Sequence, residues 1–306
     1  MSQGSERAGL LLAAYCVVNS AFVPAFAKLT TVAASGLAVA LWTSAFAGIG
    51  ALALLAWRGE LRLLVERRSA PVLVTVGALG TALAFLLFFE GAKRASAIDT
   101  AVCVQTEPVF ALLGAHFFLG HRLSKRRVFA VASILVGIAL VLGARSLEGS
   151  LGVALLLATP LAWQASHWVA LRGLDGVNPR LLSAARYVYG ALVLLPFWLL
   201  IDGVGSLPRA GELAELFPIV AIQGVLISFG GTLAWYASVK RLDLARTTAI
   251  VVPSGPLLSL VVSYLVLDEL VSLRQMIGFV VTATGVLIFA LSPNAAVVAA
   301  ESLRGD

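Results

Sequence analysis

The second half of this chain repeats the first, and both copies are almost entirely apolar. Residues 85–142 and 233–290 share the spacing of their prolines, charges, serines and glycines. Lys93–Arg94 corresponds to Lys240–Arg241, and after a shift of one residue four more positions align: Pro108 with Pro256, Ser124 with Ser272, Arg126 with Arg274, and Gly137 with Gly285. Shared composition alone does not produce such spacing. A duplicated membrane unit recurs in secondary transporters, which bind their substrate between the halves.

The composition places the chain in a membrane. Of its 306 residues 60% are hydrophobic and only 12% are charged, too few to cover a soluble domain of this size. About 20 apolar residues cross the hydrocarbon core, and long apolar runs without strand alternation are helices. We therefore expect an all-α integral membrane protein with ten transmembrane helices, at 8–28, 36–57, 71–92, 97–119, 126–144, 150–171, 179–201, 215–239, 245–267 and 273–291.

Five helices in each copy make the two repeats inverted, because an odd number of crossings starts the second copy on the opposite side. We expect repeats at 8–144 and 150–291, followed by a cytoplasmic tail at 292–306. With the N-terminus in the cytoplasm, 15 of the 22 basic residues lie inside, six lie outside and Arg186 lies within a span. This excess predicts that both termini are cytoplasmic.

The N-terminal apolar run, which ends near Ala25-Phe26-Ala27, imitates a secretory signal peptide. We expect it to remain as the first transmembrane helix, because the run is long enough to cross the membrane. Its removal would also leave the first repeat one helix short.

Glu107 is the strongest functional candidate, because a charge at mid-bilayer costs about 3 kcal/mol. It lies halfway along the fourth predicted helix, next to Pro108. Its carboxyl could bind a proton or a substrate ammonium group. Alternatively, it is a protonated side chain bonded to a carbonyl that the proline frees. Arg186 in the seventh helix could pair with Glu107 or bind a carboxylate, or its side chain could reach the cytoplasmic surface.

Further candidates are the polar and aromatic residues of matching helices. Trp163 and His167 share one face of the sixth helix, although an interfacial aromatic belt would look the same. With the substrate expected near the midplane, between helices one, three and four and helices six, eight and nine, the predicted binding residues are Asn19, Glu107, Trp163, His167, Trp235 and Tyr236. Ordinary packing is the alternative for the aromatic residues. We expect no catalytic residue, no metal ligand and no cofactor.

Other polar residues have structural interpretations. Glu90 and Arg94 are four apart and form an expected helical ion pair, and Asp99 complements a helix N-terminus. Ser124 and Ser272 are expected N-caps of the fifth helix of each repeat. Two thiols in apolar runs, Cys16 and Cys103, are expected to be core residues rather than a disulfide or metal site.

These features together resemble the drug/metabolite transporter (DMT) superfamily, and within it the EamA type. The resemblance covers about Leu10 to Leu291. It is carried by the five-plus-five duplication and by the end of each fourth helix, Gly120–His121 before Ser124 and Asp268–Glu269 before Ser272. The first copy departs from the family pattern, since His121 stands where an acid is usual. The resemblance implies exporters of amino acids and other small metabolites.

Competing function classes find less support. The sequence contains no HExxH, no GxSxG and no phosphate-binding glycine loop, which disfavours an enzyme. We expect a secondary transporter of the bacterial inner membrane that exports amino acids by alternating access. The alternative is a channel or a non-transporting helical scaffold. The expected partners are a small-molecule substrate and the lipid bilayer, with no nucleic acid, in a monomer or homodimer.

Overall fold

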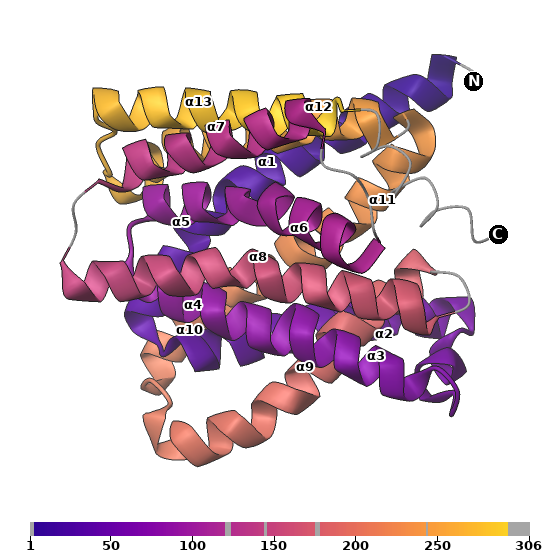
Figure 1. The fold of residues 1–306 in the computed structure, drawn as a ribbon. Helices are drawn as coiled ribbons and strands as arrows, with labels where there is room; N and C mark the ends of the chain where they lie inside the picture. The colour runs from indigo at the N-terminus through magenta and orange to yellow at the C-terminus, as the bar shows by residue number, and fades with distance from the viewer. Residues whose placement is uncertain (1–2, 120–123, 144–145, 175–177, 243, 293–306) are drawn as a thin grey trace.

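The computed structural model describes residues 3–119, 124–143, 146–174, 178–242 and 244–292. In these residues the helices form ten long spans and no strand occurs (Figure 1). The first half consists of α1 (Gln3–Ala33), α2 (Gly36–Arg58), α3 with α4 (Ala70–Gly77, Ala84–Arg94), α5 with α6 (Ala97–Cys103, Glu107–Leu119) and α7 (Lys125–Leu142). The second half consists of α8 (Leu147–Gly173), α9 (Pro179–Ile201), α10 with α11 (Ala210–Ala221, Gly231–Leu242), α12 (Leu244–Leu267) and α13 (Leu273–Ala290).

Every predicted helix corresponds to one span, so the prediction of ten helices is confirmed. Seven helical stretches are long and apolar enough to cross a membrane by length and composition alone. The other three spans are α5 with α6, α7 and α8. They carry more polar sequence, including the basic start of α7 and the Trp163–Trp168 run of α8. Most of the predicted tail, residues 293–306, lies outside the described residues, as do Gly120 and His121.

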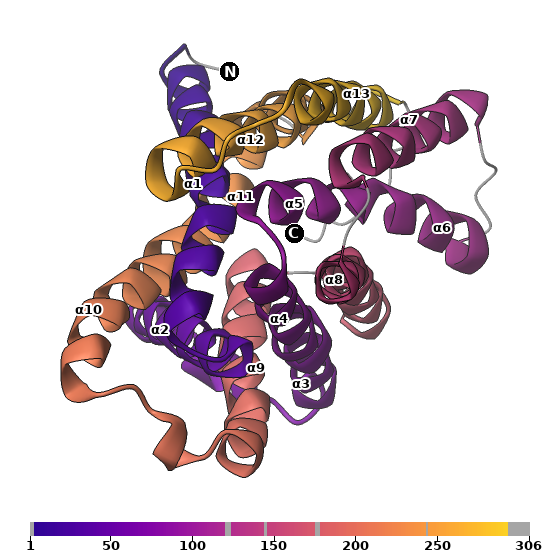
Figure 2. The ribbon, with the colours of Figure 1, turned by 90° about the vertical axis from the view of Figure 1, so that its left-hand side faces the viewer.

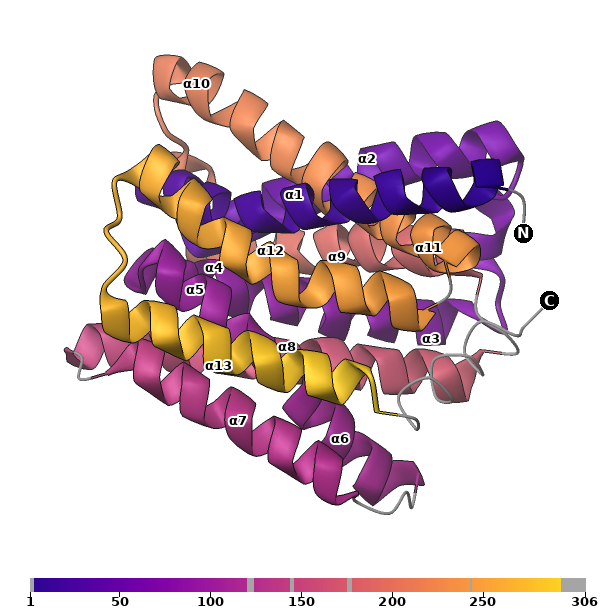
Figure 3. The same ribbon diagram turned by 90° about the horizontal axis from the view of Figure 1, so that it is seen from above.

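The two halves interlock instead of standing side by side. The most extensive helix contacts join α7 to α13, α1 to α12, α2 to α9 and α4 to α8, and each pair combines one helix from each half. Figures 2 and 3 show α7 and α13 together along one edge of the bundle. In Figure 1, α1 starts at the right end of the bundle and α8 starts at the left. The two five-span repeats are therefore inverted relative to one another.

Short connections are possible because side chains cap the helix ends. Ser124 Oγ accepts a hydrogen bond from the backbone amide of Arg127 at 3.3 Å, and Ser272 Oγ accepts one from the backbone amide of Gln275 at 3.3 Å. These bonds confirm both predicted N-caps. Ser96 and Asp99 form a capping box at the start of α5, as expected for an acid at a helix N-terminus. Both cysteines are buried, which confirms their interpretation as core residues.

The third span of each half contains a π-helical stretch, at Ala78–Leu83 and at Ile222–Gly230. When the two copies are aligned so that Lys93 matches Lys240, the first π-helical stretch corresponds to the last part of the second. A π-helical turn frees backbone carbonyls from the regular ladder, and side chains from other spans donate hydrogen bonds to carbonyls in or next to these stretches. Asn19 Nδ2 donates to Ile227 O at 2.8 Å, and Ser166 Oγ donates to Val76 O at 3.0 Å, just before the first stretch.

Candidate functional site

A cavity of about 550 Å³ lies between the two halves. Its wall combines residues of α1, α4, α5 and α6 from the first half with residues of α8, α11, α12 and α13 from the second. Most of the lining is apolar and aromatic, including Phe88, Trp163, Trp235 and Phe289. Such a wall, with a few polar groups, is typical of small-molecule sites.

Glu107 is the one charged side chain among the described residues that line the cavity. The local sequence puts it there: a 3-10 turn at Val104–Thr106 interrupts the fourth span, and Glu107 and Pro108 begin α6. Gln164 Nε2 on α8 donates a hydrogen bond to Glu107 Oε1 at 2.9 Å. This bond joins the two halves across the cavity wall and fixes the orientation of the carboxyl group.

Arg186 lies behind this wall and not in it. Its Nη2 donates to Gly80 O at 2.9 Å, within the π-helical stretch of the third span, so the guanidinium is held inside the bundle. Among the described residues no ion pair joins Arg186 to Glu107, and the hydrogen bond of its guanidinium is the one to Gly80. The interpretation in which Arg186 reaches the cytoplasmic surface therefore does not describe this structure.

The structure brings three of the six predicted binding residues together and separates the others. Glu107, Trp163 and Trp235 line the cavity. Asn19 is not part of the wall, because its amide is bonded to the π-helical stretch of the eighth span. His167 and Tyr236 are also absent from the wall and lie within electrostatic range of Arg186.

Sequence reasoning missed two contributions to the wall. Gln164 is not among the predicted binding residues, because nothing in the sequence indicates that its amide reaches the fourth span. The tenth span also contributes, through Val286, Phe289 and Ala290 at the end of α13. These residues are apolar, so no chemical signal distinguishes them from lipid-facing or packing residues.

The cavity extends toward one end of the bundle. Thr248 in the second turn of α12 and Ala290 in the last turn of α13 both line it, and α1 begins at this same end. We call this the terminal end of the bundle, and the other the distal end.

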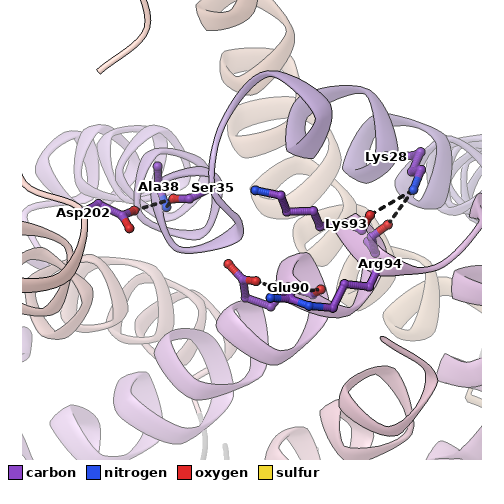
Figure 4. A network of polar contacts seen from close by, with 8 residues as sticks. Lys28, Ser35, Ala38, Glu90, Lys93, Arg94 and Asp202 are labelled. Atoms are coloured by element: carbon purple, nitrogen blue, oxygen red, sulfur yellow. Dashed lines mark hydrogen bonds and ion pairs between the residues drawn. The ribbon is translucent and has the colours of Figure 1, made fainter. Parts of the chain in front are cut away.

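Polar contacts hold the distal end together (Figure 4). Lys28 Nζ donates to the carbonyls of Lys93 at 3.0 Å and Ala95 at 2.7 Å, where α4 stops. Glu90 and Arg94 form the predicted ion pair. Ser35, the N-cap of α2, donates to Asp202 at the end of α9, which links the two halves.

A second link between the halves crosses the distal end at the turn between α4 and α5. The amides of Ala97 and Ile98 donate to the carboxylate of Glu269 at 3.0 and 3.1 Å. Glu269 lies in the connection between α12 and α13, so a loop of the second half stabilises the N-terminus of a first-half helix. The lining of the cavity thus reaches toward the terminal end, and polar contacts join the two halves at the distal end.

Comparisons with known proteins agree with this architecture. One curated relative, the uncharacterized transporter YyaM of Bacillus subtilis (strain 168), is 22% identical over 227 residues, which cover 72% of this chain and 73% of the relative. A solved crystal structure shares the fold with a TM-score of 0.64 at 19% identity, covering 98% of this chain and 99% of the other. The sequence matches the EamA-like transporter family twice, over residues 7–143 and 150–291. The chain belongs to the EamA-like transporter family and is a multi-pass membrane protein.

Proposed function

We propose that the protein is a secondary transporter that exports amino acids by alternating access between its two halves. The observation that carries the proposal is the cavity between inverted repeats, whose described lining is largely apolar and contains a single carboxyl group. An ammonium group would bind Glu107, and an apolar side chain would contact the aromatic wall. The two repeats, 8–144 and 150–291, would act as the units that rock against one another around this site.

The proposed location is the bacterial inner membrane, with both termini in the cytoplasm. The excess of basic residues in the inside loops supports this orientation. In this orientation the terminal end of the bundle faces the cytoplasm. The structure would then represent the state that loads substrate from inside, with the contacts of Lys28 and Glu269 closing the outside.

Counterflow in proteoliposomes tests this proposal. Purified protein is reconstituted without ATP, vesicles are loaded with one amino acid, and entry of a small amount of the labelled amino acid is followed across a panel. A carrier concentrates the label transiently when the same compound is inside. Uptake without this dependence on internal substrate would indicate a channel. Absence of uptake for the whole panel would favour the scaffold alternative, and uptake only with ATP would contradict secondary transport.

A further inference from the structure

The connection between α2 and α3, residues 59–69, carries a concentration of basic side chains. Arg62, Arg67 and Arg68 lie within it and Arg58 lies just before it, and all four are exposed. Because α2 starts at the distal end, this connection lies at the terminal end of the bundle (Figure 1). The corresponding connection of the second half, between α9 and α10, contains one basic and one acidic residue. The basic surface is therefore not a general property of this position in the repeat.

Contacts with the second half fix the α2–α3 connection to the bundle. Arg180 on α9 donates two hydrogen bonds to the Glu60 carboxylate, at 2.9 and 3.3 Å. Tyr189 Oη, also on α9, donates to the Leu64 carbonyl at 2.6 Å, and the Leu64 side chain is buried. Because Glu60 is already paired with Arg180, Glu66 is the one other acidic side chain of the connection that offsets its arginines.

Apolar side chains next to these arginines are also exposed. Trp57, Leu61 and Val65 are 77%, 42% and 71% exposed. The guanidinium carbon of Arg58 lies 4.7 Å from the centre of the Trp57 ring. The membrane span of α2 ends at Arg58, so these side chains lie near a membrane surface. Tryptophan and arginine are suited to this level, since the apolar part contacts acyl chains and the charge reaches the headgroups.

We propose that the α2–α3 connection is a binding site for the headgroup of an anionic phospholipid. The phosphate would bind the exposed arginines, because a guanidinium offers several donors in a fork that matches phosphate oxygens. The acyl chains would contact Trp57, Leu61 and Val65. Clusters of about four or more basic residues directly beside a membrane span are typical of anionic lipid binding. This site goes beyond the proposed function and does not depend on which substrate is transported.

A hollow of about 290 Å³ beside the connection provides room for the headgroup. Among the described residues, its polar lining consists of Glu66, Arg68, Ser69 and Asn178. Arg68 brings positive charge for a phosphate, and the Glu66 carboxylate can accept hydrogen bonds from hydroxyl groups. The combination fits phosphatidylglycerol, whose headgroup carries both a phosphate and hydroxyl groups.

Thermal unfolding of the purified full chain in a neutral detergent tests the proposal. Phosphatidylglycerol or phosphatidylcholine is titrated into the micelles, and the lipid concentration that gives half of the maximal rise in unfolding temperature is measured. We expect this concentration to be at least about tenfold lower for phosphatidylglycerol, because its net negative charge meets the arginines. Equal effects of the two lipids would overturn the proposal.

A double variant, Arg62→Gln with Arg67→Gln, removes two exposed charges from the connection. It should raise the half-saturating concentration of phosphatidylglycerol about thirtyfold and leave that of phosphatidylcholine unchanged. Lys125→Gln with Arg126→Gln is the matched control, since both residues are exposed at the start of α7, at the same end of the bundle. The control should retain wild-type binding. An equal loss in both double variants would show a general attraction of this end to negative charge and would overturn a specific site.

Inorganic phosphate and the Val65→Ser variant distinguish a lipid from a free anion. Val65→Ser keeps every charge and removes an exposed apolar contact, so it should weaken the binding of phosphatidylglycerol about threefold or more. Inorganic phosphate carries no acyl chain and should stabilise the wild type only at concentrations far above those of the lipid. If phosphate stabilises the protein as strongly as phosphatidylglycerol, or if Val65→Ser binds the lipid like the wild type, the proposed lipid site is wrong.

Discussion

At the scale of single residues, the most unusual position is Glu107. A proline follows it, a 3-10 turn precedes it, and its carboxyl faces a cavity in the middle of a membrane span. A buried ionisable group of this kind is expensive, so its presence needs a compensating interaction. Gln164 supplies a hydrogen bond from a helix of the other half. The site is therefore assembled from both halves, and neither half could form it alone.

At the scale of helices, α7 and α13 show how equivalent helices of the two halves pack. Both are glycine-containing at the contact: a Cβ at Gly137 would lie 2.6 Å from Gly278 O, and a Cβ at Gly278 would lie 2.7 Å from Gly137 O. Small residues allow such close approach between membrane helices. The two glycines therefore allow α7 and α13 to pack closely.

Replacement of Gly137 by alanine should destabilise the protein by about 1–3 kcal/mol, because the added methyl group collides with the backbone of α13. The sign of this stability change is informative, since alanine ordinarily stabilises a helix relative to glycine by up to about 1 kcal/mol. Gly211→Ala on α10 is the control, as a Cβ there meets no atom within 4 Å. Thermal unfolding in detergent compares the two. A Gly137→Ala variant that melts at or above the wild-type temperature would contradict this packing.

The helices could be predicted from the sequence because length and apolar composition decide them. The caps at Ser124 and Ser272 and the Glu90–Arg94 pair were also predictable, since each depends on neighbours within one helix. The candidate site was predictable only in part. Glu107 is recognisable as an intramembrane acid, but its contact with Gln164 depends on the packing of two helices, which local sequence does not encode. The π-helical stretches likewise depend on partners in other spans.

At the scale of the whole molecule, inverted repeats present corresponding helix ends at both ends of the bundle. The two ends nevertheless differ in their contacts and in how near the cavity comes to them. At the distal end Lys28, Ser35 and Glu269 each contact a different helix end. The cavity reaches the terminal end, where α1 begins and α13 ends. Which end faces the cytoplasm therefore decides which side loads the substrate.

Cysteine labelling tests that orientation. In a background without Cys16 and Cys103, a cysteine at position 68 should resist a membrane-impermeant maleimide in intact cells and react after permeabilisation. A cysteine at position 205 is the control; this exposed position follows α9 and should react in intact cells. Both positions lie in connections between spans, so their accessibility should differ only by side. Equal labelling of position 68 and position 205 in intact cells would contradict the proposed topology.

Glu107 is the proposed functional centre of the carrier, and counterflow by the Glu107→Gln variant tests this role most directly. The substitution keeps the shape of the side chain and removes its charge. Transport should fall at least about tenfold, because the charge is what binds the ammonium group or a proton. Glu215→Gln makes the same chemical change on the exposed surface of α10 and should leave transport intact. Near-normal transport by a folded Glu107→Gln variant would show that this residue is a neutral hydrogen-bonding partner beside Pro108, and would contradict the account.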